Sequence, residues 1–169
     1  AVAQQVRHLS TQAKADPLEY VHDAVGYNYR LTNIQAALGV AQLERMAEFL
    51  GAKREIAHRY AEAFADVPGL RFMESAPWAD SAWWLSTVLV DEGVFGCSSR
   101  ELQASLGKLG IETRPLWQPL HRSPAHTGSQ TAGEGCPVAD WLAAQALSLP
   151  SSVGLAESDQ QRVIAAISH

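Results

Sequence analysis

The pattern of apolar and polar positions predicts two helices in the first part of the chain. Apolar residues recur with helical spacing over residues 2–9 and predict the end of a helix, and residues 10–31 form a polar connection rich in turn residues. Thr32 and Gln35 have the spacing of a capping box, so a second helix is expected to begin directly after Thr32. Residues 34–43 are nearly all apolar, which predicts a helix buried on every side, either in the core or against a second subunit.

The following segment, from Glu44 to Phe64, has an amphipathic pattern. Apolar residues such as Ile56 and Tyr60 recur with helical spacing, and Lys53 falls among charged residues that can face water. Gly51 is expected to mark a break or bend between two helical parts. This segment therefore predicts a helix with one face on a core.

The rest of the chain alternates between strand and helix patterns. Runs of aromatic and β-branched residues predict strands, and serine caps and Gly stops mark helix ends. The expected elements are strands at 70–73, 83–90 and 111–114, helices at 98–109, 138–147 and 157–167, turns at 91–93 and 148–154, and a Gly/Thr/Ser loop at 127–137. This order predicts an α+β fold in which a small, largely antiparallel sheet is flanked by helices.

Composition and charge narrow the class of protein. The net charge of −5 argues against nucleic-acid binding, and no apolar run approaches the ~18 residues of a membrane span. The N-terminus lacks the apolar core of a signal peptide. Cys97 and Cys136 lie far apart, so two free thiols in a cytoplasmic chain is the simpler interpretation, with a disulfide as the alternative. Neither His22-Asp23 nor the pair His121 and His126 has further ligands nearby, so no metal site is expected.

The strip from Gly26 to Arg30 carries the first candidate chemistry. If the strip is extended, Tyr27 and Tyr29 share one face, and Asn28 and Arg30 share the other. An Arg fork beside an Asn amide is a good chemical match to a phosphate. The alternative is an aromatic-rich loop packed on the core, with Arg30 in solvent.

A second candidate is the Pro-stiffened strip from Arg114 to His121. It places a cation, the indole of Trp117, the amide of Gln118 and an imidazole directly after an expected strand. Such a segment can line a pocket for a polar ligand with a flat or anionic part. The alternative is a Pro-rich crossover with Trp117 in the core.

Four blocks in order resemble the DegT/DnrJ/EryC1/StrS-type sugar aminotransferases, which use pyridoxal phosphate (PLP). The blocks are VGYNYRLTNIQAALGVAQLE (25–44), WWLSTVLVD (83–91), GIETRPLWQPLHRSPAH (110–126) and AQALSLPSSVGL (144–155). The segment STQAKADPLEYVHDAVGYNYRL (10–31) is most similar to the branch acting on nucleotide-linked 4-keto-6-deoxy amino sugars, as in legionaminic acid pathways.

The resemblance implies a fold and a division of the chain. It implies the small C-terminal domain of a fold-type I PLP-dependent transferase, with a long bridging helix. Residues 1–31 would be a remnant of the large cofactor-binding domain, and residues 32–169 the bridging helix and the small domain.

The resemblance also implies roles for individual residues. Asn28 and Arg30 match family residues that reach across a dimer interface toward the cofactor phosphate of the neighbouring subunit. A homodimer through residues 26–43 is therefore expected. Arg114, Trp117 and His121 match the substrate-side strip and are expected to contact the sugar nucleotide. The expected amino donor is glutamate.

One departure from the family concerns catalysis. The family needs a Lys that forms a Schiff base with the cofactor, and in the family it lies upstream of the segment where this chain starts. The lysines here are Lys14, Lys53 and Lys108; Lys14 lies in a polar loop without the family context, and the other two are interpreted as solvated. No residue of the chain is therefore expected to be catalytic, and the chain alone is expected to be inactive and not to bind PLP.

Two other functions stay open. A PLP-dependent sugar dehydratase of the same fold carries a His in place of the Schiff-base Lys, and that position lies upstream. A stand-alone interaction domain is the non-enzyme alternative. The chain has no initiator Met and opens on a helix tail, which favours a piece of a longer protein.

Overall fold

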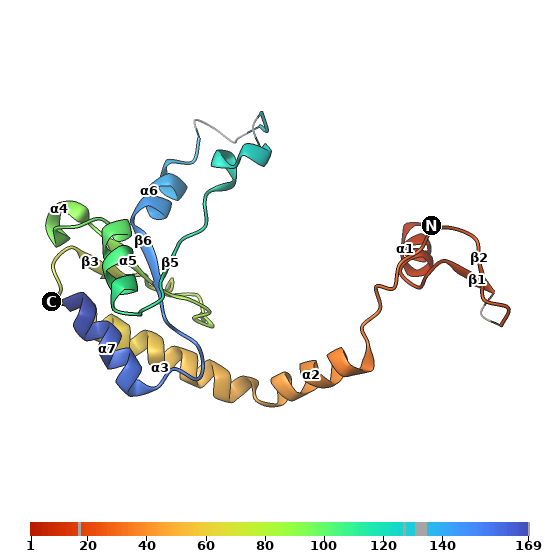
Figure 1. The fold of residues 1–169 in the computed structure, drawn as a ribbon, viewed down its shortest axis with the longest axis horizontal. Coiled ribbons are helices and arrows are strands. Elements are labelled where there is room, and N and C mark those ends of the chain that lie inside the picture. Colours follow the sequence, from red (N-terminus) through yellow and green to blue (C-terminus); the bar gives the residue numbers. More distant parts are fainter. Residues whose placement is uncertain (17, 127, 131–134, 169) are drawn as a thin grey trace. The chain divides into compact units, whose positions relative to one another are not determined.

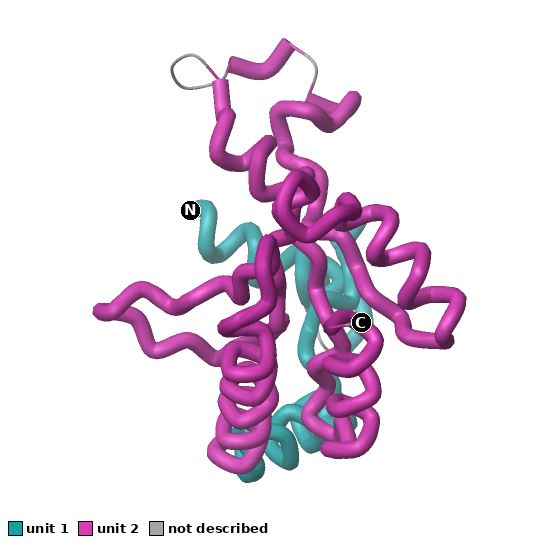
Figure 2. The backbone as a smooth tube through the Cα atoms, turned by 90° about the vertical axis from the view of Figure 1, so that its left-hand side faces the viewer, with its two compact units in different colours: residues 1–46 teal, residues 47–169 magenta. Residues whose placement is uncertain are grey.

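The computed structural model describes residues 1–16, 18–126, 128–130 and 135–168. The chain divides into two compact units, residues 1–46 and residues 47–169 (Figure 2). The expected loop at 127–137 lies partly outside the described residues. The division into residues 1–31 and 32–169 concerns the relation to a longer parent and stays a prediction.

The first unit begins with α1 (Val2–Leu9), as the sequence predicts. The connection that follows is more ordered than expected, because β1 (Lys14–Asp16) and β2 (Val21–His22) form an antiparallel hairpin (Figure 1). The chain reaches this hairpin through Gln12 and Ala13, whose φ angles are +68° and +51°. The polar, turn-rich connection of residues 10–31 thus contains a short hairpin that the sequence pattern does not predict.

Helix α2 (Asn33–Glu44) ends the first unit. Thr32 caps it through the predicted capping box, since its hydroxyl accepts from Gln35 N while the Gln35 side chain accepts from Thr32 N. No residue of α2 is buried, and Leu38 is 64% exposed. The core alternative for this apolar helix is therefore wrong for the described chain, and burial against a second subunit stays a prediction.

The break between the two helical segments lies at Arg45 and not at Gly51. Arg45 is the C-cap of α2, and α3 (Met46–Phe64) then runs without interruption through Gly51. A Cβ added at Gly51 would meet no atom within 4 Å, so this glycine fills an open position on the helix surface. The capping geometry at Arg45 accounts for the break.

The second unit contains a four-stranded antiparallel sheet, in the order β3-β4-β6-β5. The predicted α+β class with a small antiparallel sheet is confirmed. The strands are β3 (Leu70–Phe72), β4 (Ser86–Val90), β5 (Arg114–Pro115) and β6 (Ala146–Leu149).

Three strand predictions need correction. Residues 83–85 do not extend β4, because Trp83 adopts φ +49°, which ends the extended conformation. The third strand covers only Arg114–Pro115, and residues 111–113 precede it. Residues 146–149 form the central strand β6 instead of the end of a helix and the start of a turn, so α6 is confined to Pro137–Gln145.

The remaining helices agree with the sequence pattern. Helix α5 (Ser99–Lys108) begins after Ser98, which forms a capping box with Glu101, and Gly110 follows with φ +71°. A short helix, α4 (Glu92–Phe95), replaces the expected turn after β4, with the Asp91 carboxylate accepting from Gly93 N. The chain ends with α7 (Glu157–Ser168).

The core of the second unit lies on one face of the sheet. Helices α3 and α7 lie side by side, and the buried Gln160 of α7 donates to Ile56 O of α3 at 2.8 Å (Figure 1). Strand residues on this face alternate with residues on the opposite face, as the pleat requires. The buried core residues from the helices and strands include Ile56, Tyr60, Phe64, Leu70, Phe72, Val88, Val90, Leu102, Leu106, Leu147, Leu149, Val163 and Ile167.

Helix α6 contacts the opposite face of the sheet. There the Arg71 guanidinium of β3 lies 5.9 Å from the ring centre of Trp141 in α6. The paired residues Thr87 and Ser148 share a hydrogen bond of 3.1 Å on this face. The segment between β5 and α6 carries the 3-10 turns η1 (Leu120–Arg122) and η2 (Pro124–His126).

Candidate functional site

The strip from Gly26 to Arg30 is held in the first unit by backbone pairing with residues 9–12. Tyr27 N donates to Leu9 O at 2.7 Å, Tyr29 N donates to Ser10 O at 3.0 Å, and Asn28 forms a β-bridge with Thr11. The strip is therefore extended. The rings of Tyr27 and Tyr29 stack at 5.1 Å, which confirms that these two side chains share a face.

Close packing at Gly26 fixes the start of the strip. A Cβ at this position would lie 2.4 Å from Ala13 N and from the carbonyl carbon of Gln12. Both neighbours belong to the tight turn in which Ala13 is fully buried. Only glycine lets the strip approach this turn so closely.

The side chains of Asn28 and Arg30 are exposed, and Tyr27 and Tyr29 are 50% and 76% exposed. The alternative of a loop packed on the core is therefore wrong. Within the described part of the chain, the Arg30 guanidinium has no hydrogen bond or ion pair, so its donors are available. A guanidinium and an amide on a rigid strip are a suitable donor set for a phosphate dianion. The residues present therefore fit the phosphate of a cofactor.

The second strip, from Arg114 to His121, does not form one cluster. The Arg114 guanidinium pairs with Glu112 at 3.0 Å and is largely exposed. The indole of Trp117 stacks on that of Trp84 at 5.6 Å and is 64% exposed, so the alternative that places Trp117 in the core is wrong. The His121 Nε2 lies 2.9 Å from Asp140 Oδ1. The three predicted residues lie along one segment, but each has its own partner.

Asp140, in the first turn of α6, holds the η1 turn in place. The same Oδ1 that contacts His121 also accepts a hydrogen bond from Arg122 Nε. The hydrogen bond from the Arg122 guanidinium lowers the pKa of the Asp140 carboxyl below its usual value, and the charge of Arg122 adds to this effect. The carboxylate therefore fixes the orientation of the His121 ring.

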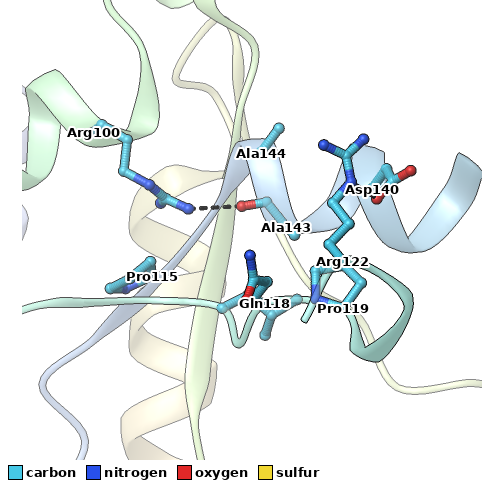
Figure 3. A pocket seen from close by; sticks show the side chains of 9 residues that line it. Arg100, Pro115, Gln118, Pro119, Arg122, Asp140, Ala143 and Ala144 are labelled. Atoms are coloured by element: carbon cyan, nitrogen blue, oxygen red, sulfur yellow. Dashed lines mark hydrogen bonds and ion pairs between the residues drawn. The ribbon is translucent and has the colours of Figure 1, made fainter. Parts of the chain in front are cut away.

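A cavity of about 460 Å³ lies between this strip, α5 and α6 (Figure 3). Arg100 points into it but donates to Ala143 O at 2.7 Å and to Ala146 O at 3.3 Å. These carbonyls belong to the end of α6, where backbone acceptors lack helical partners. Arg100 therefore caps a helix. The lining residues are Arg100, Pro115, Leu116, Gln118, Pro119, Arg122, Asp140, Ala143 and Ala144.

Lys53 is not the solvated residue that the sequence suggested. Its ammonium donates to Trp84 O at 2.6 Å, to Ser151 O and to the Ser151 hydroxyl at 3.2 Å. Partial burial lowers the pKa of Lys53. Lys14 also has a partner, because its ammonium lies 4.6 Å from the ring centre of Tyr20.

Sequence reasoning missed Trp84 and Asp140, which contact Trp117 and His121 of the second strip. It also missed the structural contacts of Lys53 and Arg100. A sequence signal for Trp84 is its place beside Trp83 in the expected strand at 83–90, since neighbouring residues of a strand point to opposite faces. Among the described residues, no cluster of three metal-ligating side chains is found. Cys97 and Cys136 are both free thiols, as the simpler interpretation predicted. No helix in the described part of the chain is long and apolar enough to cross a membrane.

Residues 1–168 match the DegT/DnrJ/EryC1/StrS aminotransferase family, and the chain belongs to this family. GDP-perosamine synthase of Caulobacter vibrioides is 35% identical over 98% of this chain and 44% of its own length. The dTDP-3-amino-3,4,6-trideoxy-alpha-D-glucose transaminase of Streptomyces venezuelae is 32% identical over 88% of this chain and 38% of its own length.

Two solved aminotransferase structures also match nearly the whole chain. DesV of S. venezuelae, in complex with a ketimine intermediate, has a TM-score of 0.79 and 30% identity over 98% of this chain and 43% of its own. The aminotransferase TlmJ of Streptoalloteichus hindustanus has a TM-score of 0.83 and 28% identity, covering 99% of this chain and 44% of its own. The chain thus spans less than half the length of these relatives and corresponds to their C-terminal part. The family resemblance and the fold of a PLP-dependent sugar aminotransferase are confirmed.

Proposed function

We propose that this chain acts as the C-terminal part of a PLP-dependent aminotransferase that moves an amino group, with glutamate as donor, to a nucleotide-linked keto sugar. The observation that carries the proposal is the rigid strip of residues 26–30, which offers Asn28 and Arg30 from a fixed backbone. The family match and the nucleotide-sugar names of the relatives support the reaction class.

Arg30 and Asn28 would hold the cofactor phosphate. When bound, PLP supplies the electron sink for amino-group chemistry. The Arg30 fork donates two parallel N–H bonds to an anion, and the Asn28 amide adds a neutral donor. Because the backbone of the strip is paired with residues 9–12, these donors meet the phosphate with little loss of freedom.

Arg114, Trp117 and His121 would contact the nucleotide sugar. Arg114 supplies an exposed cation, and Trp117 supplies an exposed aromatic face. The His121 imidazole is orientated by Asp140 and so presents a fixed polar edge. These residues bind and orient the substrate, and none is assigned a proton-transfer role.

We also propose that residues 26–43, which include most of α2, form a homodimer interface. Ile34, Leu38 and Leu43 are 76%, 64% and 66% exposed, and burying each such side chain is worth about 1.5–3 kcal/mol. In the dimer, Arg30 would reach the cofactor phosphate of the neighbouring subunit. A cytoplasmic location is proposed with this function.

The test is an assay of the chain expressed with the coding sequence that precedes Ala1. Wild-type protein is expected to transfer an amino group from glutamate to a nucleotide-linked keto sugar, with the product identified by mass spectrometry. Elimination of a sugar hydroxyl without amination would instead identify the dehydratase. If no cofactor-binding sequence precedes Ala1, the chain would be a stand-alone interaction domain and the aminotransferase proposal would fail.

A further inference from the structure

Two exposed tryptophans in the second unit stack on each other. The ring centres of Trp84 and Trp117 are 5.6 Å apart with an interplanar angle of 24°, and the residues are 72% and 64% exposed. Indole side chains with this much accessible surface still present an aromatic face to solvent. Such a face can stack on any flat ring of similar size.

The backbone that carries Trp84 is held in an unusual conformation. The preceding residue, Trp83, has φ +49°, which a bulky side chain rarely adopts and which requires support from its surroundings. Two contacts supply this support: the Trp83 ring lies 5.5 Å from that of Phe72, and Trp83 N donates to the Ser81 hydroxyl. The strained residue therefore sets the direction of the chain directly before Trp84, which lies outside the sheet.

Lys53 provides a third support from another element. Its ammonium donates to Trp84 O and to both the carbonyl and the hydroxyl oxygen of Ser151. The long side chain thus joins α3, the segment just before β4 and the turn after β6 at the Trp84 backbone. Three separate contacts therefore hold the backbone at Trp83 and Trp84, whereas the Trp84 indole itself is largely in solvent.

We propose that Trp84 and Trp117 form a stacking platform for the nucleobase of the substrate, with Lys53 as a positioning residue. The inference rests on the proposed function, which supplies a nucleotide-linked sugar as the ligand. Stacking accepts every base, since each base has an aromatic face. The platform therefore recognises a nucleotide without selecting between purine and pyrimidine, and base selection must come from other residues.

The experiment uses the 169-residue chain and the nucleotides UMP and GMP, with ribose 5-phosphate as the probe that lacks a base. Indole N–H signals of ¹⁵N-labelled protein are followed by NMR during titration. The signals of Trp84 and Trp117 are expected to shift with both nucleotides, with Kd values within about tenfold of each other. Trp78 is 88% exposed and has no ring partner in the described part, so its signal is the matched control and should not move.

Substitutions then test each residue. Trp84→Ala and Trp117→Ala should each raise Kd by roughly 5- to 150-fold, the range of one base–aromatic stack, while Trp78→Ala leaves it unchanged. Lys53→Met should weaken binding and Lys53→Arg should restore it, because Arg can still donate to the carbonyls. Circular dichroism of each variant verifies that the fold is retained.

Several outcomes would overturn the platform. Equal shifts with ribose 5-phosphate, or unchanged Kd in Trp84→Ala, would remove the nucleobase from this position. A wild-type dimer that Trp84→Ala converts to monomer, with no response to nucleotides, would make the pair a protein interface. Nucleotide binding without amino transfer in the longer protein would retain the platform and reject the proposed reaction, so the two failures are distinguishable.

Discussion

Substituting Gly26 by Ala should release the strip that carries Asn28 and Arg30. The added Cβ would lie 2.4 Å from backbone atoms of Gln12 and Ala13, whereas ordinary contacts begin at 3.4 Å. The strip must therefore move by about 1 Å, and neither neighbour is a side-chain end that can rotate away. The φ of Gly26 lies outside the left-handed region, so the effect comes from this contact alone.

The displacement is large enough to break the pairing of the strip. The hydrogen bonds from Tyr27 N to Leu9 O and from Tyr29 N to Ser10 O measure 2.7 and 3.0 Å. Lengthening them by about 1 Å takes both beyond the range of a normal N–H···O bond. Overpacking of this kind costs about 1–3 kcal/mol, which corresponds to roughly 5- to 150-fold faster opening.

Amide hydrogen exchange of Tyr27 and Tyr29 measures this opening directly. The matched control is Gly51→Ala, because a Cβ there meets nothing within 4 Å and lies in the middle of α3. The control should stabilise the protein by about 0.5–1 kcal/mol, the preference of a helix for Ala over Gly. Unchanged exchange at both tyrosines in Gly26→Ala would refute the reasoning.

Three further predictions concern single side chains. In the longer protein, Arg30→Ala should weaken PLP retention by about 1.5–3 kcal/mol and Arg30→Lys by less, and unchanged affinity would remove Arg30 from the site. Tyr60→Phe loses the 2.9 Å hydrogen bond to Pro150 O, so urea unfolding should show a loss of about 0.5–1.5 kcal/mol. The pKa of Asp140 is lower in the folded protein than the value of about 3.9 in the unfolded chain. The ionised carboxylate therefore stabilises the folded state above about pH 4, and this contribution is lost as the pH falls through the folded pKa. The difference in melting temperature between wild type and Asp140→Asn should accordingly shrink below about pH 4.

The sequence predicted those elements whose signals are local. Both capping boxes, at Thr32 and Ser98, lie within four consecutive residues, and the helices begin where these boxes place them. The stacking of Tyr27 and Tyr29 follows equally from the two-residue period of an extended strip. In each case the residues that determine the conformation are neighbours in the chain.

The errors arise where distant contacts decide the conformation. Residues 146–149 continue an apolar helical pattern, but they pair with β4 on one side and with β5 on the other, and this pairing makes them a strand. Trp83 has a strong strand propensity, yet its contacts with Phe72 hold it at φ +49°. No local pattern contains this information.

The same distinction applies to the candidate site. Residue type alone identified Arg30, Trp117 and His121 as candidates, since cations, indoles and imidazoles carry recognisable chemistry. Their partners could not be predicted, because Asp140 reaches His121 and Trp84 reaches Trp117 only in the folded unit. The sequence therefore named ligand-binding groups but not the contacts that orient them.

The two units differ in how much of their apolar surface they bury. The second unit buries a continuous core of helix and sheet residues, whereas α2 in the first unit buries none of its side chains. An apolar helix with every face exposed is unfavourable in water, so α2 is expected to be covered in the assembled protein. The donors of Arg30 lie just before this helix. If a second subunit is the cover, phosphate binding depends on dimer formation, so Leu38→Glu should weaken both. Arg30→Ala should weaken phosphate binding and leave the dimer of the phosphate-free protein unchanged.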